Sequence, residues 1–252
     1  HHTFQIGLRL ARILFIYTVF IVYTELHCLT HYSFLRGASA PEELVGRAAN
    51  SGYHALAITD ECSLAGVVKA HVAAKERGLK LIVGSEFTLT EGIRLVALVP
   101  SREAYGELSG LISRARRRSG KGEYRVHLRD VIFHLKRCLL ILLPDDTDNQ
   151  TVHLQQLARR CKGRVWIGIS RLLGNDEWRR FKHRYHMAQN LQVPMVACGE
   201  VQMHSAKRKA LHDVLTAIRL QTPVQQLGHR RLINSQQHLR TLDTLHSLYP
   251  ET

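Results

Sequence analysis

Four residues with metal-ligating side chains follow predicted strands in this sequence: His27, Glu61, Glu86 and Glu200. The carboxyl ends of barrel strands meet at one mouth, so the four side chains could converge there. Imidazole and carboxylate groups are ligands for Zn, Mn or Mg, and in a hydrolase such metals generate hydroxide and hold a phosphate ester. The structural alternative is that a histidine at a strand end is a hydrogen-bonded rim residue, and that an acidic residue there caps the next helix.

The elements that must position these residues alternate along the chain. Short apolar runs predict strands at Tyr23–Cys28, Ala55–Thr59, Leu79–Val83, Arg94–Val99, Cys138–Leu143, Arg164–Ile169 and Pro194–Cys198. Amphipathic stretches predict helices at Ala38–Ser51, Ala65–Arg77, Arg102–Arg117, Val152–Cys161, Asp176–Leu191 and Ala206–Leu220. This alternation predicts a parallel sheet with helical crossovers, and about seven repeats favour closure into a TIM-like α/β barrel.

The first 22 residues stand apart from this pattern. Ile13–Tyr23 is almost wholly apolar and follows Arg9 and Arg12, as in the n- and h-regions of a signal peptide. The run is too short to span a bilayer and no small-residue cleavage site follows it. We interpret residues 1–22 as a non-native apolar extension, with an export signal as the alternative, residues 23–220 as the barrel and residues 221–252 as a C-terminal tail. We expect no association with a membrane.

The chain of 252 residues carries 35 Lys and Arg against 21 Asp and Glu, which gives a formal net charge of +14. Such a charge favours contact with a polyanion such as nucleic acid, although a solvated basic surface is the alternative. The basic cluster that we predict to contact nucleic acid contains Arg114, Arg116, Arg117, Arg118 and Lys121. A second basic cluster contains Arg179, Arg180, Lys182, His183 and Arg184.

The five cysteines disfavour a zinc ribbon and a disulfide framework, because no pair has CxxC spacing and the number is odd. Cys138 and Cys198 lie in apolar runs and are predicted to be small core residues. A reducing, cytoplasmic location fits this cysteine usage best.

Three segments resemble, in the same order, the first three motifs of the PHP (polymerase-and-histidinol-phosphatase) domain: His27–Ser39 (HCLTHYSFLRGAS), Ala57–Gly66 (AITDECSLAG) and Ala73–Phe87 (AAKERGLKLIVGSEF). Their residues are most similar to the error-prone branch of bacterial DNA polymerase III alpha-type subunits. Gly120–Tyr124 and His212–Arg219 are also similar to that branch. The resemblance covers roughly Tyr23 to Pro250 and implies a distorted (β/α)7 PHP barrel.

Several positions depart from the family's metal-binding pattern. The first motif is normally His-x-His but here contains Leu29, which cannot ligate a metal. Gln202 stands in the second ligand position of the family's late Asp-x-His motif, and Arg94 brings a positive charge to a position that is often histidine. The residues that could still ligate are His27, Glu61, Glu86 and Glu200. The resemblance therefore implies a degenerate site that retains at most one residual Zn, Mn or Mg ion, and we favour the expectation that no metal binds.

The polymerase reaction of the family needs paired aspartates in a palm domain, which hold two Mg ions. Asp145, Asp146 and Asp148 form the only dense acidic cluster here, and we interpret it as a turn and helix cap because it lies between a strand and a helix. The palm lies far downstream in the family. We therefore expect the chain to be a piece or a truncated product of a longer polymerase, with no catalytic residues of its own.

By this resemblance, the leading hypothesis is the PHP domain of an error-prone DNA-directed DNA polymerase, a nucleotidyltransferase of DNA repair and translesion replication. In that hypothesis the PHP fold is a structural platform beside the palm. The implied partners are DNA, a sliding clamp and companion mutagenesis proteins. One alternative is a free-standing, metal-dependent phosphoesterase of the PHP class, and another is a non-functional remnant of a polymerase that merely folds.

Overall fold

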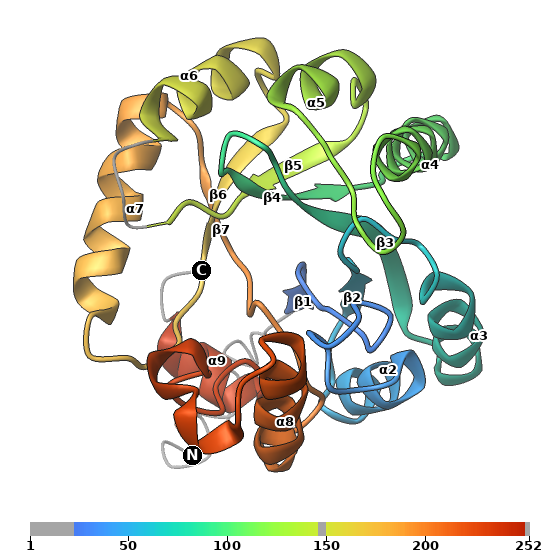
Figure 1. Ribbon diagram of the computed structural model, residues 1–252, viewed down its shortest axis with the longest axis vertical. Helices are drawn as coiled ribbons and strands as arrows, with labels where there is room; N and C mark the ends of the chain where they lie inside the picture. Colours follow the sequence, from blue (N-terminus) through green and yellow to red (C-terminus); the bar gives the residue numbers. More distant parts are fainter. Residues whose placement is uncertain (1–22, 146–149, 250–252) are drawn as a thin grey trace, which may run out of the picture.

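The computed structural model describes residues 23–145 and 150–249 of the chain. Seven strands form one sheet in chain order: β1 (Thr24–Glu25), β2 (Ala55–Ile58), β3 (Lys80–Thr88), β4 (Arg94–Leu98), β5 (Leu139–Leu142), β6 (Val165–Ile169) and β7 (Met195–Ala197). The sheet curls into a nearly closed barrel with the helices outside it (Figure 1). The predicted seven-stranded, TIM-like α/β barrel is therefore confirmed.

Eight α-helices surround the strands within the described residues: α2 (Pro41–Asn50), α3 (Val67–Arg77), α4 (Arg102–Arg117), α5 (Leu128–His134), α6 (Thr151–Arg160), α7 (Glu177–Leu191), α8 (Lys209–Arg219) and α9 (Leu242–Leu248). Capping interactions define the ends of these helices. The Glu43 carboxylate accepts a hydrogen bond from Ala40 N at the start of α2, and Gly78 ends α3 in the left-handed region at φ 66°. The short helix α5 was not predicted.

Strand β4 corrects the expectation of a parallel sheet. It pairs antiparallel with both neighbours, with Thr88 opposite Arg94 and Leu98 opposite Leu139. Residues 89–93, which join β3 to β4, are too few for a crossover helix, so the chain turns back as a hairpin. The first residue of β4 therefore lies at the mouth, where the parallel strands have their last residues. Helix α4 then runs back towards the mouth as well.

Apolar side chains fill the space between the strands and the helices and also the inside of the barrel. Phe87, Leu95 and Leu140 belong to the largest buried cluster, while Ile141 and Cys198 belong to a smaller one. All five cysteines are buried as free thiols. The prediction that Cys138 and Cys198 are core residues is confirmed, since both are fully buried.

The barrel closes between β1 and the segment that follows β7. An isolated parallel bridge joins Cys28 to Val201 there. The buried carboxylate of Glu25 accepts hydrogen bonds from His27 N (3.0 Å) and Gly199 N (2.7 Å), so one side chain satisfies backbone donors on both sides of the seam. A Cβ at Gly199 would lie 2.4 Å from Glu25 Oε2, so a larger residue here would displace the Glu25 carboxylate. Burial raises the pKa of Glu25, although these backbone hydrogen bonds act to lower it.

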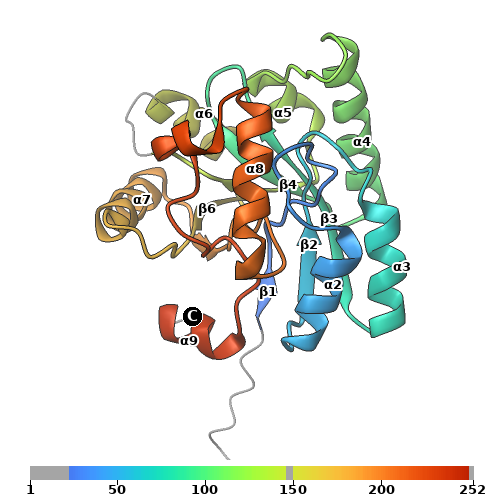
Figure 2. The ribbon, with the colours of Figure 1, turned by 60° about the horizontal axis from the view of Figure 1, so that its bottom comes forward.

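The segment predicted as a tail from residue 221 packs on the barrel. Leu239 and Leu245 are buried in the cluster beneath α2 and α3, and the Tyr53 hydroxyl donates to Arg240 O at 2.8 Å. Figure 2 shows α9 beside the start of β1. The predicted apolar extension, residues 1–22, lies outside the described residues. Among the described helices, none is long and apolar enough to cross a membrane.

The seam predicts a large effect of one side chain on stability. Glu25→Ala should lower the free energy of unfolding by about 2–4 kcal/mol, because two buried N–H groups lose their acceptor and each costs roughly 1–3 kcal/mol. Urea unfolding measures this, with Glu76→Ala on the exposed face of α3 as the control. Equal stability of the two variants would contradict this account of the seam.

Candidate functional site

The mouth of the barrel gathers the four predicted ligand residues from four strand ends. His27 follows β1, Glu61 follows β2, Glu86 lies near the end of β3 and Glu200 follows β7. Three of the four are buried, with exposed fractions of 2% for His27, 0% for Glu86 and 7% for Glu200. The Glu61 side chain is partly exposed at 25%. Three ionisable groups are therefore held out of water in a small volume.

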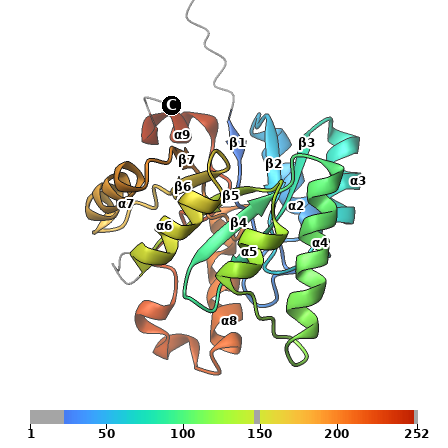
Figure 3. The ribbon, with the colours of Figure 1, turned by 90° about the horizontal axis from the view of Figure 1, so that it is seen from above.

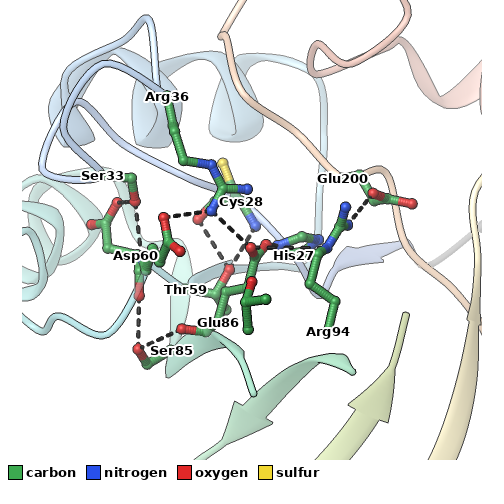
Figure 4. Close-up of polar contacts among 12 residues, drawn as sticks. His27, Cys28, Ser33, Arg36, Thr59, Asp60, Ser85, Glu86, Arg94 and Glu200 are labelled. Carbon is green, nitrogen blue, oxygen red and sulfur yellow. Dashed lines mark hydrogen bonds and ion pairs between the residues drawn. The ribbon is translucent and has the colours of Figure 1, made fainter. Parts of the chain in front are cut away.

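The loop after β1 is held in place by the buried carboxylate of Asp60, which follows β2. Asp60 Oδ1 accepts from Thr30 N (2.8 Å) and from the Ser33 hydroxyl (2.7 Å), and its Oδ2 accepts from the Thr30 hydroxyl (2.8 Å). Gly37 returns so close to this loop that a Cβ would lie 2.0 Å from Thr30 O. These contacts fix the position of the intervening Arg36 (Figure 4).

Arg36 joins two of the predicted ligands. Its Nη1 atom lies 2.6 Å from Glu61 Oε2 and 2.9 Å from Glu86 Oε1. On the other side of Glu86, Oε2 lies 2.6 Å from His27 Nε2. The Tyr124 hydroxyl donates to Glu61 Oε1 at 2.8 Å. The carboxylates of Glu61 and Glu86 are therefore engaged by side chains of the protein itself.

Arg94 makes a corresponding contact with Glu200. Its Nη2 donates to Glu200 Oε2, and its Nε lies 3.9 Å from Glu86 Oε1, so it stands between two carboxylates (Figure 4). Glu200 Oε1 accepts from the Ser170 hydroxyl at 2.7 Å and lies 3.8 Å from Arg184 Nη1. Glu200 lies in the left-handed region at φ 48°, which is uncommon for a residue with a Cβ. The ion pairs help to hold that backbone.

The charges at the mouth shift one another's pKa values. Burial alone would raise the pKa of Glu86, but the close contact with His27 and the charges of His27, Arg36 and Arg94 hold it well below its usual range. The pKa of Glu200 falls to about 2, because Arg94 and Arg184 outweigh the burial of the carboxylate. The pKa of Arg36 is raised, since Glu86 and Glu61 outweigh its burial. These groups form an internally compensated network of charges.

The residues at the mouth do not fit a metal centre. Guanidinium groups, which carry a fixed positive charge and have no acceptor, lie against Glu61, Glu86 and Glu200. Within residues 23–145 and 150–249, no group of three His, Cys, Asp or Glu side chains is arranged so that it could hold a metal ion. His27 Nε2 and Glu86 Oε2 are buried without a hydrogen bond of good geometry, but they supply only two ligand atoms. A catalytic centre of two or three metals has too few ligands here.

Two family positions that were predicted to have lost their ligands are occupied in other ways. Leu29 is fully buried and packs as an apolar side chain. Gln202 Oε1 lies 2.6 Å from His212 Nε2, so this side chain engages α8. Burial lowers the pKa of His212 to about 4. Gln202 therefore contributes to the packing of α8.

The basic cluster at the end of α4 divides into two groups. Arg116 donates to the backbone oxygens of Glu61 and Cys62 at 3.2–3.3 Å, and Arg118 Nη1 lies 2.6 Å from Asp130 Oδ2. These two arginines tie α4 to the mouth and to α5. The remaining members of the cluster, Arg114, Arg117 and Lys121, are exposed. None of the three takes part in an ion pair with another described residue.

Sequence reasoning missed the roles of Arg36 and Arg184. Arg36 lies inside the first family motif, and its pairing with two strand ends depends on the fold of the loop. Arg184 belongs to the second basic cluster, but it points inward and donates to Gly168 O at 3.0 Å. Its spacing of four residues from the buried Ala188 is the sequence feature that could have revealed this. Of the acidic cluster, Asp145 accepts from Gln150 Nε2 at 3.1 Å, and Asp146 and Asp148 lie outside the described residues.

Comparison with protein families finds a match between residues 25–161 and the family described as PHP domain. The chain is 54% identical over 230 residues to an error-prone DNA polymerase of Saccharophagus degradans and 46% identical over 230 residues to one of Pseudomonas aeruginosa. Each comparison covers 91% of this chain and 22% of the relative. The chain therefore spans about a fifth of the length of the curated relatives that it matches.

Two solved structures share the fold. A protein of Bifidobacterium adolescentis, named as a metal-dependent phosphoesterase, superposes with a TM-score of 0.52 at 17% identity, covering 71% of this chain and 87% of that one. An amidohydrolase of Chromobacterium violaceum, with bound sulfate and no metal, superposes with a TM-score of 0.51 at 16% identity and the same coverage. At such identities the likeness concerns the architecture alone.

The lowered pKa of Glu200 predicts a defined pH dependence. Because its folded pKa lies below its unfolded value, its ion pairs stabilise the fold above about pH 4.5, and this stabilisation is lost as the pH falls towards 2. The free energy of unfolding of the native chain should exceed that of Glu200→Gln by on the order of 3 kcal/mol at pH 7, and the difference should shrink below pH 4.5. Urea unfolding at several pH values measures it.

The exposed Glu76→Gln provides the control for this series and should show a difference near zero at every pH. A difference between native and Glu200→Gln protein that stays constant from pH 7 to pH 3 would rule out the ion pairs of Glu200 as its cause.

Proposed function

The chain belongs to the PHP domain family, and from that premise we propose that it forms the PHP domain of an error-prone DNA polymerase, in which its barrel has a structural role. One observation carries the structural part of this proposal. Arg36 and Arg94, which carry fixed positive charges, form ion pairs with the carboxylates that a metal centre at the mouth would need. A barrel whose mouth carboxylates are paired with arginines in this way would not hold the metals that hydrolyse phosphate esters. It can still present a rigid, basic surface beside the polymerase region.

The polymerase part of the proposal rests on the curated relatives, which carry the name of error-prone DNA polymerases. The whole protein would transfer nucleotides to a primer on damaged template in DNA repair and translesion replication, with Mg at a palm domain. Its partners would be DNA, a sliding clamp and companion mutagenesis proteins, and it would act in the cytoplasm. The palm residues do not belong to the described barrel, in which no catalytic residue is assigned.

A second candidate is a metal-dependent phosphoesterase, and one observation favours it. His27 Nε2 and Glu86 Oε2 are buried side by side without a well-formed hydrogen bond, and imidazole and carboxylate are ligand types of Zn and Mn. The neighbouring Arg36 and Arg94 oppose a cation at this place, since both lie within 4 Å of Glu86. We therefore favour the structural role.

Addition of metal separates the two candidates. Zn, Mn or Mg at about 100 μM should leave the midpoint of thermal unfolding within about 1 °C of its value in a chelator, because no site binds them. An ion bound with a dissociation constant near 1 μM would instead add about 2.7 kcal/mol of stability at that concentration, or roughly 5–10 °C for a chain of this size. Differential scanning calorimetry measures the midpoint.

Metal analysis and a phosphodiester hydrolysis assay complete this test. We expect less than one tightly bound metal per chain and no turnover. Two or more bound metals, together with turnover that is lost in Glu86→Ala and retained in Glu76→Ala, would replace the structural role by the phosphoesterase.

DNA contact is proposed for the exposed part of the α4 cluster. Helix α4 runs towards the mouth because β4 is antiparallel, so Arg114, Arg117 and Lys121 lie together at that end of the barrel. Phosphate contacts of this kind position a protein on DNA and read no sequence. Each contact releases counterions, so binding should weaken as salt concentration rises.

Replacement of Arg114, Arg117 and Lys121 by alanine should reduce the slope of log binding constant against log salt concentration by about 3, because three phosphate contacts are lost. Fluorescence anisotropy with a labelled duplex at several salt concentrations measures the slope. The matched control replaces Arg159, Arg160 and Lys162, three exposed bases at the end of α6, and removes the same charge. Equal changes in both triple variants would show a general effect of net charge and refute the contact at α4.

A further inference from the structure

Three aromatic rings form a ladder along one flank of α7: Trp178, Phe181 and Tyr185. The ring centroids of Trp178 and Phe181 lie 5.6 Å apart with planes 11° from parallel, and those of Phe181 and Tyr185 lie 6.4 Å apart with planes 23° from parallel. The ladder is open to solvent, since Trp178 is 63% exposed and Tyr185 is 42% exposed. Figure 3 shows α7 at the outer edge of the barrel.

The fold does not need these rings to hold α7 in place. The helix packs on the barrel through the buried Ala188 and through Met187 and Leu191. Arg184 adds hydrogen bonds to Gly168 O and Pro144 O. Pairs of residues at this spacing on a helix surface stabilise it by only about 0.2–0.5 kcal/mol. Stabilisation of the helix therefore does not account for three large aromatic side chains, two of them exposed.

The helix that carries the ladder is rich in basic residues. From Glu177 to Leu191 the helix has four Lys and Arg residues and a single acidic residue. That residue, Glu177, pairs with Arg171, and Asp176 before the helix pairs with Arg179 at 3.3 Å. Lys182 lies 5.3 Å from the centroid of the Trp178 ring. Acidic groups beside the rings are thus neutralised, while a flexible ammonium group lies over the ring that is most exposed.

We propose that Trp178, Phe181, Tyr185 and Lys182 of α7 form a platform on which unpaired bases of single-stranded DNA stack. The proposal rests on the proposed DNA polymerase function and extends it, because it names a state of the DNA and a place on the barrel that binds it. Aromatic faces bind any base, and neighbouring cations follow the phosphates, which is how proteins hold single strands without reading sequence. Lys182 can turn from the Trp178 ring to a phosphate as a base takes its place.

Base stacking favours a single strand over a duplex, because the bases of a duplex stack on one another and leave no face free for a side chain. The positive charge beside the rings discriminates less well between DNA and an acidic protein surface. Binding of a protein partner is therefore an outcome that the test must distinguish. The platform is also distinct from the α4 cluster. Helices α4 and α7 lie on opposite sides of the barrel in all three views (Figures 1, 2 and 3).

Tryptophan fluorescence tests the platform directly. The chain has two tryptophans, and Trp166, the other one, lines an apolar cavity between strands. In Trp166→Phe the emission therefore reports Trp178 alone. We expect a thymidine 16-mer to quench this emission, and an abasic strand of the same length and charge to bind without quenching it. Quenching that is equal with both strands would overturn stacking at Trp178.

Affinity for the labelled 16-mer, measured by anisotropy in the otherwise native chain, gives a second readout that does not depend on Trp166. Trp178→Ala and Tyr185→Ala should each weaken binding roughly 5- to 100-fold. Phe133→Ala, which removes another exposed ring from α5, should leave binding unchanged. Unchanged binding in all three variants would overturn the platform and leave any α4 contact standing.

The two DNA proposals can fail separately. Loss of binding in the α7 variants, with an unchanged salt slope in the triple variant at α4, supports the platform and rejects the α4 contact. A surface that docks a protein would show neither quenching nor any change of affinity for the 16-mer, and this result rejects the platform.

Discussion

Three carboxylates that meet at the mouth of a narrow barrel cannot all remain charged unless cations lie beside them. An isolated charge of this kind costs several kcal/mol or more to remove from water, and neighbouring like charges add to that cost. In this chain, arginine side chains supply the compensation for Glu61, Glu86 and Glu200. The positions of Arg36 and Arg94 in turn depend on a tightly packed loop and on a reversed strand. The organisation of the mouth thus follows from a requirement of charge balance.

The sequence predicted the barrel, most of its elements and the strand ends at which polar residues gather. It did not predict the direction of β4, because periodicity reports which residues are buried and is the same for parallel and antiparallel strands. The short connection between β3 and β4 carried that information. Arg94 could be recognised as a charge that opposes metal, but its partner Glu200 is 106 positions away along the chain. Such a contact depends on the closure of the barrel.

The loop residue Arg36 shows a different limit. Nothing in its neighbourhood distinguishes a guanidinium that enters the mouth from one that stays in water, because the difference arises from Gly37 and Asp60, which fold the loop back on itself. Helix α5 was missed for a related reason. With seven residues it is too short to establish a helical period, and its buried residues Leu128 and Val131 acquire meaning only from their packing against the main cluster.

The arginines at the mouth have an evolutionary consequence. A single substitution that restores a ligand, such as histidine in place of Leu29, would add a polar group to a buried site without creating a metal centre, because the guanidinium groups remain. Removal of Arg36 or Arg94 alone would leave buried acids with less compensating charge, and the intermediate would be destabilised. Any mutational path to a metal centre therefore crosses less stable sequences unless several positions change together. The charge balance at the mouth therefore resists the introduction of a metal ion.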